Sequence, residues 1–85
     1  MNTIKEYLEE LERLEKITNE AEEQWTSDPT NRRYEEIFDK AYEEQFYVFL
    51  ALSQYIECIT HGRIHQRDAR VMIRQKRNEL FSIAP

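Results

Sequence analysis

Glycine and proline are almost absent from this chain of 85 residues, and their scarcity limits its fold more than any other feature. The chain has one glycine, Gly62, and two prolines, Pro29 and the last residue, Pro85. Proteins rich in strands need glycine and proline at their many turns, whereas the interior of a helix tolerates neither residue well. We therefore expect an all-α protein in which Pro29 and Gly62 mark helix ends.

Apolar residues recur at helical spacing in three segments. These segments are about residues 3–26, 29–60 and 65–81. Thr3 and Glu6 have the spacing of a capping box at the start of the first segment. Asp28 is a suitable N-cap for the second, with Pro29 at its first helical position, and Gly62 is the natural cap at its C-terminal end.

The lengths and apolar faces of these segments predict how they pack. So short a connection at residues 27–29 makes the first two helices antiparallel neighbours. Residues 46–59 are apolar on nearly every side, so this part of the second helix needs a further partner. The third helix, folded back at Gly62, would lie antiparallel beside residues 45–60. We predict an antiparallel three-helix bundle, a long helical hairpin plus a shorter C-terminal helix, as one domain spanning residues 1–85.

Charge changes sign along the chain, although the net charge is −5. Residues 1–29 carry three basic and nine acidic side chains, and residues 61–85 carry six basic and two acidic ones. Five arginines recur every three or four residues, which would place them on one outward face of the third helix. They are Arg63, Arg67, Arg70, Arg74 and Arg77. This face would pair with glutamates in solvent, bind the phosphates of a nucleic acid, or bind an acidic protein.

Cys58, His61 and His65 are the one group of residue types that could suggest a metal site. We expect no metal there, because Gly62 should break the helix between the two histidines. We expect Cys58 to pack beneath the third helix as a small apolar side chain, with both histidines exposed. No basic residues from several helices converge on one pocket, so we expect neither a cofactor nor enzymatic activity.

The end of the hairpin near Pro29 should lack cover, because the third helix is too short to reach it. Two helices share one narrow seam and cannot bury many large side chains between them. We therefore expect a homodimer in which two hairpin ends form a four-helix bundle about a two-fold axis. The residues nearest this interface would be Trp25, Tyr34, Ile37 and Phe38.

These patterns favour a small non-enzymatic intracellular protein that acts by protein–protein interaction or regulation. One alternative is a nucleic-acid-binding protein that uses the arginine face, and another is a helical inhibitor or immunity-type protein that neutralises a partner. The N-terminus lacks the layout of a secretion signal, and no apolar stretch approaches the ~20 residues of a membrane-spanning helix. The single cysteine requires no oxidising compartment, so we expect a cytoplasmic protein without membrane contact.

Overall fold

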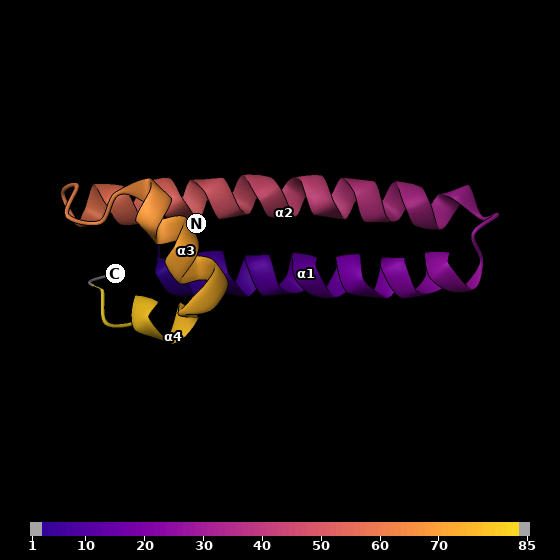
Figure 1. The fold of residues 1–85 in the computed structure, drawn as a ribbon, viewed down its shortest axis with the longest axis horizontal. Coiled ribbons are helices and arrows are strands. Elements are labelled where there is room, and N and C mark those ends of the chain that lie inside the picture. Colours follow the sequence, from indigo (N-terminus) through magenta and orange to yellow (C-terminus); the bar gives the residue numbers. More distant parts are fainter. Residues whose placement is uncertain (1–2, 84–85) are drawn as a thin grey trace.

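The computed structural model describes residues 3–83, and this part of the chain contains helices and no strand. The helices are α1 (Ile4–Ser27), α2 (Arg32–Ile59), α3 (Gln66–Gln75) and the single turn α4 (Arg77–Leu80). Figure 1 shows α1 and α2 side by side as an antiparallel hairpin, with α3 and α4 against one end of it. The predicted all-α fold, a long helical hairpin with a shorter C-terminal helical segment, is confirmed.

The connection between α1 and α2 is longer than the sequence suggested. Asp28 was expected to cap the second helix, but it is the C-terminal cap of α1, because its backbone N–H donates to Gln24 at 3.0 Å. The Asp28 carboxylate accepts a hydrogen bond from the Thr30 hydroxyl at 2.9 Å, so it is engaged within the turn. Asn31 caps α2 instead, and its side-chain oxygen accepts from the Arg33 N–H at 3.0 Å.

The reversal after α2 follows the prediction for Gly62 and adds a second unusual residue. Gly62 has a φ of 80°, and its N–H donates to the carbonyl of Glu57 at 2.9 Å. His61, one residue earlier, has a φ of 52°, and its N–H donates to the carbonyl of Cys58 at 3.1 Å. This pair of bonds forms a Schellman motif, in which His61 occupies the left-handed position that glycine usually takes.

The third helix differs from the prediction in both direction and length. It was expected to run antiparallel beside α2, but α3 crosses the hairpin from α2 towards α1 (Figure 1). A core of buried residues joins the four helices there. It contains Ile4, Leu8 and Leu11 of α1, Phe49, Leu52 and Ile56 of α2, and Ala69 and Ile73 of α3, together with Leu80 of α4. Because α3 crosses both helices, its ten residues are enough to cover the apolar side chains of α1 and α2 at this end of the hairpin.

The helix expected over residues 65–81 breaks at Lys76, which has a φ of −141° and a ψ of 47°. Its N–H still donates to Met72 at 2.7 Å, but the Ile73 carbonyl accepts from Nε of the Arg77 side chain at 2.7 Å. The break lets α4 turn, so that Leu80 lies fully buried in the core. The rest of the hairpin, in a molecule 48 Å long, extends beyond α3 without a third helix.

Candidate functional site

Two hollows lie end to end along the seam between α1 and α2, and we call them together the seam groove. The first begins where α3 ends and is lined by Phe46, Phe49 and Arg74 among others. The second lies further towards the hairpin turn and is lined by Phe38 and Glu22 among others. Tyr42, Gln45 and Glu15 line both hollows, so the groove is continuous past the point where α3 stops covering the hairpin.

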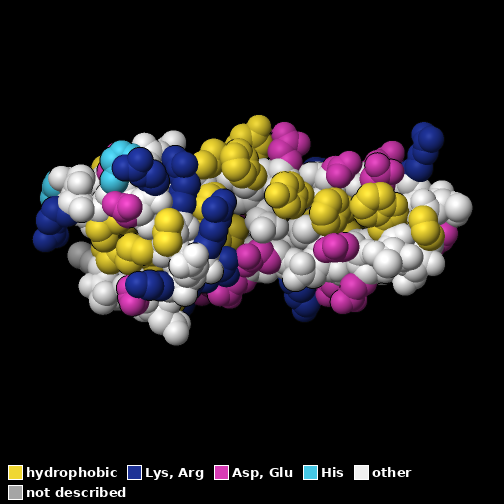
Figure 2. Space-filling model, viewed as in Figure 1, with side chains coloured by type: hydrophobic (Ala, Val, Ile, Leu, Met, Phe, Trp, Pro, Cys, Tyr) yellow, Lys and Arg dark blue, Asp and Glu magenta, His cyan; other side chains and the backbone are white. Residues whose placement is uncertain are grey.

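A row of aromatic side chains follows this groove and continues past its end to Trp25, and we call Trp25, Phe38, Tyr42 and Phe46 the aromatic row. The ring centroids of Trp25 and Phe38 lie 6.1 Å apart, and those of Phe38 and Tyr42 lie 5.9 Å apart. Tyr42 is 58% exposed and Phe46 is 51% exposed. Figure 2 shows hydrophobic side chains in a line along the hairpin on this face. Aromatic residues in a continuous line form one exposed apolar patch, and such patches mark interaction sites more often than scattered apolar residues do.

The two ends of the groove carry opposite charges. Arg74 places its guanidinium carbon 4.8 Å from the centre of the Phe49 ring, and Arg77 donates two hydrogen bonds of 2.8 Å to the Glu15 carboxylate. These bonds raise the pKa of Arg77 above its usual value. Glu22 lies in the other hollow, which has no arginine or lysine in its lining. Most Lys and Arg side chains on this face gather at the α3 end, and Asp and Glu flank the hairpin (Figure 2).

The five arginines predicted to form one outward row do not share one helix. Arg67, Arg70 and Arg74 belong to α3, Arg77 belongs to α4, and Arg63 lies in the loop before α3. Arg63 donates to the Thr60 carbonyl at 3.3 Å, and Arg70 donates to the Gln66 side chain at 3.4 Å. The row is broken because the helix stops at Lys76 and Arg77 turns inward to Glu15. Arg67 and Arg74 remain exposed on α3.

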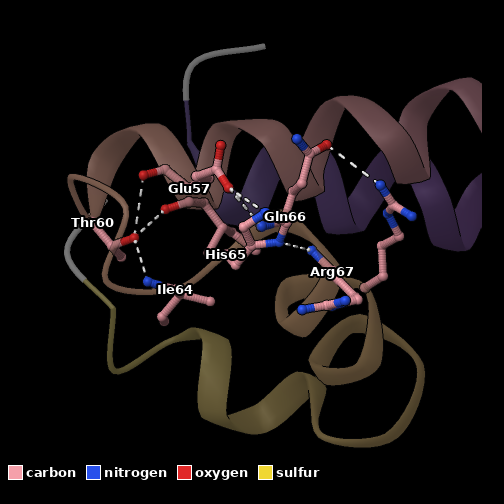
Figure 3. Close-up of polar contacts among 8 residues, drawn as sticks. Glu57, Thr60, Ile64, His65, Gln66 and Arg67 are labelled. Atoms are coloured by element: carbon pink, nitrogen blue, oxygen red, sulfur yellow. Dashed lines mark hydrogen bonds and ion pairs between the residues drawn. The ribbon is translucent and has the colours of Figure 1, made fainter.

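The residues considered for a metal site take other roles at the reversal between α2 and α3. His65 caps α3, and its Nδ1 accepts from the Arg67 N–H at 3.1 Å (Figure 3). Glu57 accepts from the Gln66 N–H at 2.9 Å and lies 3.8 Å from Nε2 of His65. Cys58 is exposed, so the expectation that α3 would cover it was wrong. The steep crossing of α3 leaves that side of α2 open.

The residues predicted at a dimer interface are only partly exposed, and two of them, Trp25 and Phe38, pack against each other. Trp25, Tyr34 and Phe38 are half-buried, and Ile37 is 40% exposed. The more exposed aromatic side chains of the groove, Tyr42 and Phe46, lie closer to α3 and were not among the residues predicted at an interface. Tyr42 lies in the part of α2 that the predicted third helix was too short to cover, whereas Phe46 was expected beside that helix.

Within residues 3–83, no three His, Cys, Asp or Glu side chains are grouped so that they could hold a metal ion. None of the helices described there combines the length and apolar character needed to cross a membrane. Comparison of the chain with protein-family models, curated proteins and solved structures found no match.

Proposed function

We propose that this protein acts by binding another protein chain, and that the seam groove is its binding surface. The observation that carries the proposal is the aromatic row, because Tyr42 and Phe46 are more than half exposed beside a hollow that continues the core. Aromatic residues are enriched at protein interfaces, where an apolar ring is buried and a polar edge can keep a hydrogen bond. The uncovered seam leaves room for a further helix along α1 and α2.

Charged residues beside the aromatic row give this surface a means of selecting its partner. Arg74 and Arg77 lie at one end and Glu22 at the other, so the groove can select a partner by its charge pattern as well as by its apolar side chains. Both regulation of a partner and neutralisation of a toxin-like partner would use such a surface. This proposal includes no chemical step and no cofactor.

Nucleic-acid binding, the alternative expected from the arginines, has less support. Arg77 is engaged by Glu15, Arg74 stacks on Phe49, and Arg63 bonds the backbone of Thr60. A strong phosphate-binding surface requires several cations that are free to face one backbone. Four of the five arginines instead contact different neighbours within the chain, namely Arg63, Arg70, Arg74 and Arg77.

Photo-crosslinking within cells that express the chain tests the proposal. Tyr42 is replaced by the photoreactive residue benzoylphenylalanine, and the matched control places the same residue at Phe81, which is 62% exposed and lines neither hollow of the groove. We expect a covalent protein adduct from position 42 and much less from position 81. The absence of any protein adduct from position 42, or equal adducts from both positions, would contradict the proposal.

A further inference from the structure

The arrangement of charge around the aromatic row suggests what fills the seam groove. We infer that a second copy of this chain occupies it, with the two hairpins antiparallel about a two-fold axis close to Tyr42. This inference rests on the proposed function, because it names the partner for the same groove. Homodimers with two-fold symmetry are the commonest small assemblies, and each copy must then offer a surface that complements itself.

Three residues line both hollows, and Tyr42 is the exposed aromatic side chain among them, so we place the axis there. The hollow on one side of it contains Arg74 and Arg77, and the hollow on the other side contains Glu22. A half-turn about Tyr42 exchanges the two sides. It therefore brings the arginine end of one copy over the glutamate end of the other, and it does so twice.

The spacing along α2 makes this exchange geometrically consistent. Arg74 lies over Phe49, which follows Tyr42 by about 10 Å at a rise of 1.5 Å per residue. Glu35, at the same distance of about 10 Å on the other side of Tyr42, lies in the first turn of α2 and is exposed. The rotation thus places Arg74 opposite the level of Glu35 of the second copy, with Glu22 beside Phe38 about one turn of α2 closer to the axis. Opposite charges at both ends would fix the register of the two hairpins.

The centre of this interface would be apolar. Phe38, Tyr42 and Phe46 of each copy would face the same three residues of the other copy in reverse order, with Tyr42 against itself. The dimer would bury the exposed ring faces of these residues, and offset or tilted ring pairs would add to the free energy gained from this burial. Charged residues would then surround an apolar centre, as in most specific interfaces.

Two other arrangements fit the charges less well. A dimer at the hairpin ends, as expected from the sequence, would bring together Glu22 and Glu23 of both copies, which line hollows with Phe38 and Tyr34, and like charges in contact are unfavourable. A foreign helix would need an acidic end beside Arg74 and a basic end beside Glu22. A second copy of this chain meets both requirements, because its own groove has Glu22 at one end and Arg74 at the other.

Charge reversal at both ends gives a sharp test by sedimentation equilibrium at low ionic strength and micromolar protein. The wild-type chain should form a dimer. Arg74→Glu alone and Glu22→Arg alone should each raise the dimer Kd at least about tenfold, because each homodimer then contains two like-charge contacts. Mixed in equal amounts, the two variants should associate with each other, because both contacts of the mixed pair become attractive again.

Arg33→Glu and Glu20→Arg are the matched controls, since both residues are exposed and line neither hollow. They should leave the dimer Kd within about twofold of the wild type, which separates local contacts from a general effect of net charge. Circular dichroism verifies that each variant keeps its helical content.

A monomeric wild-type chain would overturn the inference, and so would variants that associate like the wild type or that fail to associate with each other. The proposed function would be judged separately by the crosslinks from position 42. An adduct with a different protein would support the function and reject the second copy, whereas no protein adduct at all would reject both.

Discussion

Ile73 should contribute more to stability than any exposed residue of α3, because it is the side chain that holds α3 over the hairpin. It is fully buried in the core shared with Leu52 and Ile56 of α2. Ile73→Ala removes three carbon atoms, worth about 2.4 kcal/mol of lost burial at ~0.8 kcal/mol each. The cavity left behind adds to this, so we expect a total loss of about 3–4 kcal/mol. Chains of this size have a free energy of unfolding of about 4–13 kcal/mol, so the variant should lose a large share of it.

Urea unfolding, followed by circular dichroism at one fixed protein concentration, measures this loss. Val71→Ala is the matched control, because Val71 lies on the same helix and is 47% exposed. It should cost less than about 1 kcal/mol, as surface substitutions usually do. Equal losses in the two variants would refute the reasoning, since α3 would then not be held to the hairpin by the face that contains Ile73.

Three further predictions concern the turn, the ion pair and the first helix. Gly62→Ala should lower the free energy of unfolding in urea by about 1 kcal/mol, because an added Cβ would meet no neighbour but alanine disfavours the left-handed backbone at this position. His61→Gly should raise the free energy of unfolding by about 0.5 kcal/mol or more, because glycine adopts the positive φ of this residue without strain. The opposite signs would contradict the Schellman motif. Glu15→Gln should lower the free energy of unfolding by about 1 kcal/mol, because it removes the charge partner of Arg77, and the loss should be smaller at high salt. A loss that does not change with salt would argue against the ion pair. Thr3→Ala should cost about 1 kcal/mol by removing the hydrogen bond at the start of α1, whereas Thr3→Ser should restore it.

Local signals in the sequence were enough to predict the hairpin. Helical spacing, the cap at Thr3 and the positive φ of Gly62 depend on residues close together in the chain, and the structure has all three. The break at Lys76 could not be predicted in this way. It is accompanied by burial of Leu80 in the core and by the bond between Arg77 and Glu15, a residue 62 positions away in the sequence.

The site was harder to predict than the fold for the same reason. Regular spacing placed the arginines on one face of an assumed continuous helix, and the break in that helix separated Arg77 from the rest. The exposed positions of Cys58 and Phe46 depend on the direction in which α3 crosses α2, which no spacing in the sequence encodes. The change of charge along the sequence also appears in the structure, because α3 and α4 place Arg74 and Arg77 at one end of the groove.

The distance between the two hairpin turns tests the antiparallel dimer most directly. A spin label at Thr30→Cys, in a chain that also carries Cys58→Ser, allows this distance to be measured by pulsed electron paramagnetic resonance. Thr30 lies in the turn just before α2, about 18 Å from Tyr42 when the helical rise is extended to it, so an axis at Tyr42 predicts about 36 Å between the two turns before the length of the labels is added. A dimer at the hairpin ends would give about 20 Å or less. That shorter distance, or no distance between chains at all, would contradict the antiparallel dimer.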